Sequence, residues 1–65
     1  MTLGQTIRKV RQKKGYSLKQ VEIKSGISAS LICKWELDKN VPTIHSLIKL
    51  ADGLKISLDE LVGRV

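Results

Sequence analysis

At 65 residues, the chain is expected to form one domain over residues 1–65, with a small core, because a chain of this length buries only about 60% of its unfolded surface. Its single cysteine, Cys33, rules out a disulfide framework, its single histidine, His45, leaves a zinc site short of ligands, and no apolar run is long enough for a membrane span or a signal peptide. The formal net charge of +6 falls within residues 1–39, a one-sided balance that favours polyanions as partners or serves solubility alone.

The first two predicted helices each begin with a capping-box pattern, in which a glutamine follows Thr or Ser three residues later. Thr2 begins a helix whose apolar residues recur at helical spacing until Gly15. Ser17 begins a second, shorter helix, which Gly26 ends. Two helices joined by a short glycine-containing link are therefore expected before residue 28.

Three more predicted helices follow. Ser28 can cap a helix that ends near Leu37, and a loop then runs to Pro42, which disfavours helical geometry at the residue before it. Thr43 caps a fourth helix, and Ser57 opens a last short helix with a third capping box. The predicted apolar stripe of the fourth helix consists of Ile44, Leu47, Ile48 and Ala51. Since no segment alternates with a period of two, the sequence predicts an all-α bundle of five short helices.

Residues 17–37 have the layout of a helix-turn-helix, with Gly26 at the joint, and the second helix of that motif enters the DNA major groove. Many all-α proteins contain two helices joined by glycine, so the surface of the second helix decides the interpretation. At 100° per residue, one face carries Leu31, Ile32 and Trp35 and is expected to pack on the core. The opposite face carries Ala29, Ser30, Cys33, Lys34 and Leu37.

Small side chains on that opposite face let the backbone approach base edges closely. Ala29 can touch a thymine methyl group, Ser30 can donate or accept a hydrogen bond, and Lys34 can reach a guanine edge or a phosphate. The alternative is an ordinary solvated face, but such a face usually carries more charge. The pattern favours DNA binding.

An arginine on the apolar stripe of the first helix gives a second indication. Arg11 lies four residues after Ile7, and a buried guanidinium needs a charged partner. Glu36 stands at the edge of the apolar face of the helix over residues 28–37, so we expect an Arg11–Glu36 ion pair between the two helices. Otherwise Arg11 extends along the surface to solvent.

Taken together, these residues resemble the XRE family, the phage repressor and Cro type of helix-turn-helix protein. The resemblance covers residues 3–62. It rests on Ile7-Arg8-Lys9-Val10-Arg11, Lys14-Gly15-Tyr16-Ser17, Gly26-Ile27-Ser28, Trp35-Glu36, Lys39, Pro42 and Leu54-Lys55-Ile56-Ser57-Leu58-Asp59-Glu60-Leu61. The Gly-Tyr-Ser-Leu segment at residues 15–18 is also similar to the branch of the Bacillus biofilm and sporulation repressors.

The resemblance implies a compact five-helix, lambda-repressor-like domain that binds double-stranded operator DNA, usually as a homodimer, and regulates transcription on the bacterial nucleoid in the cytoplasm. An enzyme is disfavoured by the residues themselves, because the sequence has no nucleophile–base pair, no metal-ligand set and no phosphate-binding loop, and no cofactor is expected. The family's base-contacting positions fall on Ala29, Ser30 and Lys34. Its backbone or flanking contacts fall on Leu18, Lys19, Ser28, Leu31, Lys39 and Asn40, and its structural ion pair falls on Arg11 and Glu36. Arg8, Lys9 and Lys13 are further candidates for phosphate contacts.

Several positions depart from the family pattern. Leu18 replaces a common glutamine, and Glu22 with Ile23 replaces an alanine and a polar residue. Asp38 and Lys55 stand where glycine is common, so we expect a left-handed backbone at either residue.

Two questions stay open at this level. Cys33 is either a redox switch or simply a small residue facing the groove. Some of the apolar residues of the last two helices form either a homodimer seam or a satellite core; they are Leu50, Leu54, Leu58, Leu61 and Val62. The alternative function is a protein-interaction module such as an antitoxin, which an exposed patch of Ile23, Leu50 and Val62 would favour.

Overall fold

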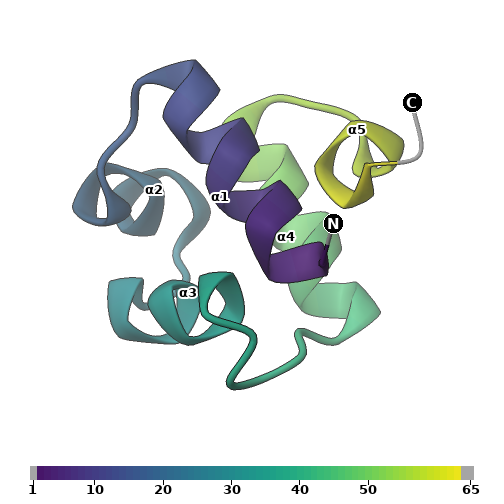
Figure 1. Cartoon of the computed structure of the whole chain (residues 1–65). Coiled ribbons are helices and arrows are strands. Elements are labelled where there is room, and N and C mark those ends of the chain that lie inside the picture. Colours follow the sequence, from purple (N-terminus) through teal and green to yellow (C-terminus); the bar gives the residue numbers. More distant parts are fainter. Residues whose placement is uncertain (1, 64–65) are drawn as a thin grey trace.

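The computed structural model describes residues 2–63, and within that range the chain forms five α-helices and no strand (Figure 1). This confirms the predicted all-α, five-helix class. The helices are α1 (Leu3–Lys14), α2 (Leu18–Ser25), α3 (Ala29–Glu36), α4 (Ile44–Leu54) and α5 (Leu58–Val62). None of the helices in the described range is long and apolar enough to cross a membrane.

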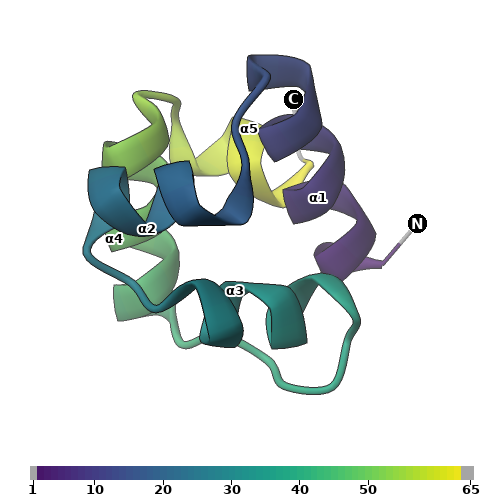
Figure 2. The same cartoon turned by 90° about the vertical axis from the view of Figure 1, so that its left-hand side faces the viewer.

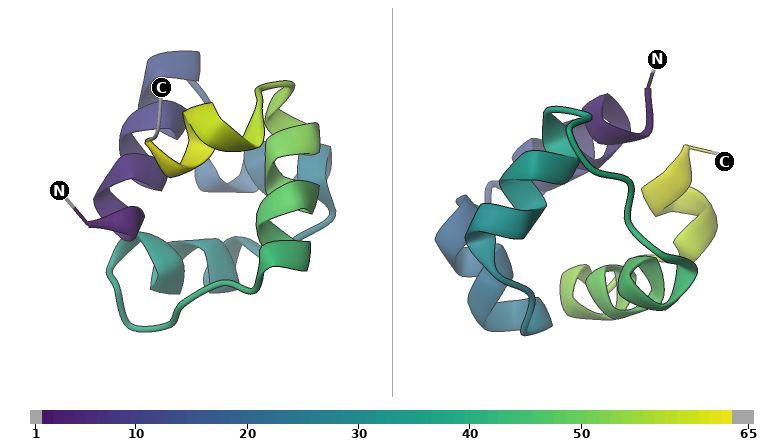
Figure 3. Two further views of the ribbon diagram at one scale, coloured as in Figure 1. Left: turned by 90° about the vertical axis from the view of Figure 1, so that its right-hand side faces the viewer. Right: turned by 90° about the horizontal axis from the view of Figure 1, so that it is seen from below.

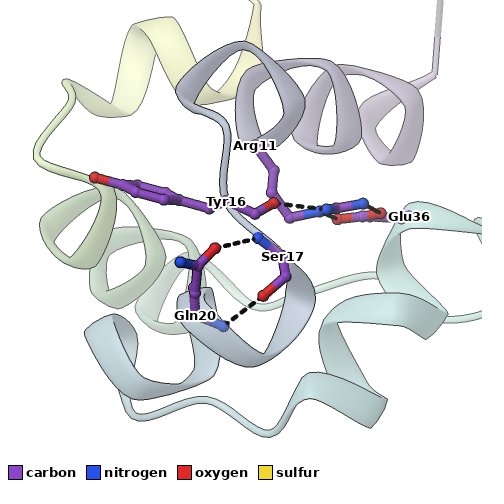
Figure 4. Close-up of polar contacts among 5 residues, drawn as sticks. All are labelled: Arg11, Tyr16, Ser17, Gln20 and Glu36. Atoms are coloured by element: carbon purple, nitrogen blue, oxygen red, sulfur yellow. Dashed lines mark hydrogen bonds and ion pairs between the residues drawn. The ribbon is translucent and has the colours of Figure 1, made fainter.

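Hydrogen-bonded caps begin the helices at the expected residues. Ser17 and Gln20 form the reciprocal bonds of a capping box, at 3.1 and 2.7 Å (Figure 4), and Thr2 starts α1 in the same way. The third predicted box is wrong in one half. The hydroxyl of Ser57 accepts from the amide of Glu60 at 3.1 Å, but α5 has only this forward bond. Glu60 is instead one of the residues that line a groove between α1 and α5.

The helices pack in a closed arrangement around one core. Helix α1 contacts α3 on one side and α5 on the other, while α2 packs on α3 and α4. Figure 3 shows α5 lying between α1 and the end of α4, which closes the bundle opposite α2 and α3. The largest fully buried side chains come from all five helices; they are Ile7, Val21, Ile32, Leu50, Leu54 and Leu61. Trp35 is buried with them, as its helical position predicts.

The apolar stripe predicted for α4 is partly wrong. Leu47 and Ala51 are buried as expected, but Ile44 is 61% exposed and Ile48 is 46% exposed. The core-facing side of α4 is instead completed by Leu50 and Leu54. The apolar arc of this helix is wider than the strip that α2 and α5 cover, and the i, i+4 rule does not say which edge of the arc stays outside.

A close helix crossing fixes α4 against the end of α2, and it was not predicted from the sequence. A Cβ atom at Gly53 would lie 2.7 Å from Cα of Ser25, so only glycine permits this approach. The hydroxyl of the buried Ser25 donates to the carbonyl oxygen of Val21 at 2.7 Å and accepts from the amide of Ile27 at 3.2 Å. The joint that precedes α3 is thereby held in place from α4.

Both residues expected to be left-handed are so, with φ of 59° at Asp38 and 58° at Lys55, but their surroundings differ. The Asp38 carboxylate accepts from the amide of Gly4 at 3.1 Å and from the hydroxyl of Thr2 at 2.7 Å. Lys55 is an exposed C-cap.

We therefore expect opposite effects from two glycine substitutions. Lys55→Gly removes left-handed strain of about 1–2 kcal/mol and should raise the melting temperature, although the greater freedom of unfolded glycine offsets part of the gain. Asp38→Gly relieves the same strain but loses the bonds to Gly4 of α1 and to its N-cap Thr2, so it should be neutral or destabilising. Thermal unfolding followed by circular dichroism checks both variants; a lower melting temperature for Lys55→Gly would contradict the assignment of strain.

Candidate nucleic-acid interface

The joint between α2 and α3 is built from glycine, a buried anchor and a cap. Gly26 adopts φ of 75°, which glycine accepts without cost, and its amide donates to the carbonyl oxygen of Glu22 at 2.8 Å. Ile27 points into the core and is 7% exposed. The hydroxyl of Ser28 then accepts from the amide of Leu31 at 3.4 Å and begins α3. Figure 2 shows α3 beneath α2, the two being joined by this short link.

The two faces of α3 differ as the sequence predicts, although not in every residue. Ile32 and Trp35 are buried, and Ser30 and Lys34 are exposed on the other side. Ala29 and Cys33 of the predicted outer face are only partly exposed. Leu31, which the sequence places on the packing face, is itself half-buried at the edge of the core. The bare surface of α3 is thus narrower than predicted and centres on Ser30 and Lys34.

A buried ion pair fixes α3 to α1. Arg11 and Glu36 form a bidentate ion pair, in which Nε donates to Oε2 at 2.7 Å and Nη2 donates to Oε1 at 3.0 Å (Figure 4). Nη1 of Arg11 also donates to the carbonyl oxygen of Tyr16 at 2.8 Å. The hydrogen bond to Glu36 raises the pKa of Arg11 above its ordinary value, although burial opposes it. Arg11 therefore stays charged, and a single side chain joins α1, the start of α2 and the end of α3.

A second tie between the same helices was missed from the sequence. The Asp38 carboxylate, directly after α3, accepts from the Gly4 amide in the first turn of α1, where the helix dipole favours a negative charge. Gly4 is needed there because a Cβ atom would clash with the carbonyl oxygen of Trp35 and lie 2.9 Å from that of Glu36. An aspartate after a helix and a glycine near an N-terminus are too common to have revealed a contact across 34 positions.

The residues predicted to contact the DNA backbone lie around α3, but they differ in exposure and in the helix or loop that carries them. Lys19 is exposed in the first turn of α2, and Lys39 and Asn40 are exposed in the loop that leaves α3. Leu18 is half-buried and packs against the core. Lys9 and Lys13 line the groove between α1 and α5, together with Val62, so they lie on the side of α1 that meets α5.

The two departures on α2 have different consequences. The Glu22 carboxylate accepts from the amide of Ala29 at 3.3 Å and lies 3.8 Å from Nζ of Lys19. It therefore occupies the joint instead of being buried in the core, which explains how the helix tolerates a carboxylate at this position. Ile23 is 74% exposed. The patch of Ile23, Leu50 and Val62 is not formed, because Leu50 is fully buried and Val62 is half-buried.

The apolar residues of α4 and α5 that could form either a dimer seam or a satellite core differ in their burial. Leu50, Leu54 and Leu61 are buried in the core of their own chain, and Leu58 and Val62 pack at its edge. Exposed apolar surface on this side of the molecule comes instead from Val41, Ile44 and Ile48. His45 is exposed. Among residues 2–63, no group of three or more metal-ligating side chains is placed to hold an ion.

Comparison with known proteins gives one family and several relatives. A family described as Helix-turn-helix matches residues 7–61. The cryptic phage CTXphi transcriptional repressor RstR of Vibrio cholerae is 49% identical over 39 residues, which cover 60% of this chain and 35% of that protein. From Bacillus subtilis, the HTH-type transcriptional regulator ImmR is 33% identical over 64 residues, 98% of this chain and 50% of that protein.

The HTH-type transcriptional regulator SlrR, also of Bacillus subtilis, is 37% identical over 60 residues, 91% of this chain and 40% of that protein. The chain thus spans half or less of the length of these three relatives. No solved structure gave a significant match.

Proposed function

Since the chain belongs to the XRE-type helix-turn-helix family, we propose that it is a sequence-specific DNA-binding transcriptional regulator, most simply a repressor, that places α3 in the major groove. The observation that carries this proposal is the fixed α3 itself. Its inner face is buried, its C-terminal end is tied to α1 by the Arg11–Glu36 pair, and it presents Ser30 and Lys34 outward. Relatives named as transcriptional repressors and regulators support the same function.

In this proposal Ala29, Ser30 and Lys34 contact bases, and the residues around α3 contact the DNA backbone. Lys19, Lys39 and Asn40 are exposed and can reach phosphates, and Ser28 stands at the start of α3. Leu18 and Leu31 are half-buried apolar residues that would flank the DNA major groove. Their side chains carry no charge with which to bind a phosphate. Lys9 and Lys13 contribute less to phosphate binding in this proposal, because they line the groove between α1 and α5.

The protein is further proposed to act as a homodimer through α4 and α5, on the nucleoid and without catalysis. Isologous pairing would place two copies of α3 on successive major grooves, as a palindromic operator requires. The exposed Ile44 and Ile48 offer apolar surface for such a seam, whereas Leu50, Leu54 and Leu61 are occupied by their own core. The antitoxin-like alternative loses its main support because the expected apolar patch is absent from the described surface.

Lys34→Ala should weaken binding to the preferred operator by about 1–3 kcal/mol and relax the base preference at one position, since a lysine that reads a guanine edge supplies discrimination of this size. Lys39→Ala is the matched comparison. It should weaken binding on every sequence alike and reduce the slope of log K against log salt by about 1, as expected for a phosphate contact. Titration of labelled duplexes at several salt concentrations measures both quantities. An equal loss on all sequences for Lys34→Ala would reassign Lys34 to phosphate.

A further inference from the structure

One carboxylate oxygen of α2 contacts two groups that the proposed interface uses. Oε1 of Glu22 accepts from the amide of Ala29 at 3.3 Å, and the same atom lies 3.8 Å from Nζ of Lys19. Ala29 is the first residue of α3, and Lys19 lies in the first turn of α2. Of the hydrogen bonds formed by residues 2–63, this one alone joins a residue of α2 to a residue of α3.

The contact of Glu22 with Ala29 and Lys19 affects the position of α3 more than the stability of the fold. The first amides of a helix lack partners within the helix, and here Ser28 satisfies that of Leu31 while Glu22 satisfies that of Ala29. The Glu22 side chain is 37% exposed and the Lys19 side chain 74% exposed, so water screens their attraction and the pair adds little to the free energy of unfolding. What the contact fixes is where the first turn of α3 lies relative to α2.

We propose that Glu22 is a positioning residue of the DNA interface, which holds the first turn of α3 in register with Lys19. This inference rests on the proposed function, in which Ala29 faces bases and Lys19 faces a phosphate. Phosphate contacts set the register of a protein on the duplex, whereas base contacts carry the sequence information. A residue that links the two therefore acts on discrimination between sequences. Its negative charge also lowers the affinity for all DNA, because it stands beside a phosphate-contacting lysine.

The test compares Glu22→Ala with Glu22→Gln on two duplexes, the sequence that the wild type selects and a scrambled one. Glu22→Ala frees both the Ala29 amide and Lys19, so binding to the scrambled duplex should tighten while the ratio of the two dissociation constants falls by about tenfold, near the cost of one mismatched base pair. Glu22→Gln keeps an oxygen acceptor for the Ala29 amide and should retain most of the ratio. Asp52→Asn, on the exposed surface of α4, is the control for loss of one negative charge.

Two results would overturn the proposal. In the first, Glu22→Ala changes both dissociation constants by the same factor as Asp52→Asn does, which would leave Glu22 with an effect of charge alone. In the second, the melting temperature of Glu22→Ala falls while the ratio is unchanged, which is the outcome of a merely structural role. If the wild type itself binds the two duplexes equally, the proposed function fails before any variant is measured, and this inference falls with it.

Discussion

Glu36→Ala is expected to destabilise the fold by about 3–5 kcal/mol, because it leaves the Arg11 guanidinium among buried groups without its counter-charge. The side chains of Arg11 and Glu36 are only 13% and 5% exposed, so water does not replace the lost partner. The free energy of unfolding is roughly 0.05–0.15 kcal/mol per residue in small proteins, so this loss is comparable to the whole stability of a 65-residue chain. Urea unfolding followed by the fluorescence of Trp35 measures it.

A double variant separates the unpaired charge from the loss of packing. Arg11→Leu with Glu36→Leu removes both charges together, and replacement of a buried pair by apolar residues is often neutral or stabilising. We expect the double variant to recover most of the stability that Glu36→Ala loses, less the bond from Arg11 to the carbonyl oxygen of Tyr16. An unchanged melting temperature in Glu36→Ala would show that the pair does not hold α1 to α3.

Gly4→Ala is the second large effect, and its sign is informative. At an unhindered helical site, alanine is more stable than glycine by about 0.5–1 kcal/mol, because glycine loses more freedom on folding. At Gly4, the added Cβ atom would meet the carbonyl oxygens of Trp35 and Glu36, which belong to the backbone and cannot rotate away. We therefore expect a loss of about 1–3 kcal/mol or more, the usual range for overpacking.

The same substitution tests the close packing of α1 against the end of α3. Helix α1 must lift from the end of α3 to accommodate the methyl group, which would also lengthen the bond from the Gly4 amide to Asp38. Trp35 is 3% exposed, so a red shift of its emission in the folded variant would report the opening. A melting temperature raised by Gly4→Ala would mean that the close contact between α1 and α3 does not exist in solution.

The parts of this fold that depend on local sequence were predictable. Thr2, Ser17 and Thr43 cap their helices where expected, because a cap needs only the few residues around it. The counter-charge of Arg11 could also be inferred, since a charge on an apolar stripe needs a partner and Glu36 lies at the edge of the facing helix. The bond from Arg11 to the carbonyl oxygen of Tyr16 was not predicted. The helix-turn-helix itself followed from one glycine and the unequal faces of one helix.

The parts that depend on distances between helices were not predictable. Gly4 and Gly53 look like ordinary helical glycines until the crossing backbones are placed beside them. The bonds of Asp38 to α1, and the exposure of Ile44 and Ile48, depend in the same way on which helix covers which neighbour. Glu22 is the instructive case, because it stands where the family pattern has alanine, and its carboxylate satisfies an amide of α3 seven residues away.

Selection of bound duplexes from a random-sequence pool, followed by sequencing, shows whether α3 reads DNA sequence. We expect an enriched palindrome whose half-sites are about 10 bp apart, the spacing of successive major grooves on one side of the helix. Enrichment of a single half-site would still support sequence-specific DNA binding by α3 but would contradict the proposed dimer. No enrichment, with only weak binding that salt abolishes, would contradict the claim and leave the basic surface as a nonspecific attraction.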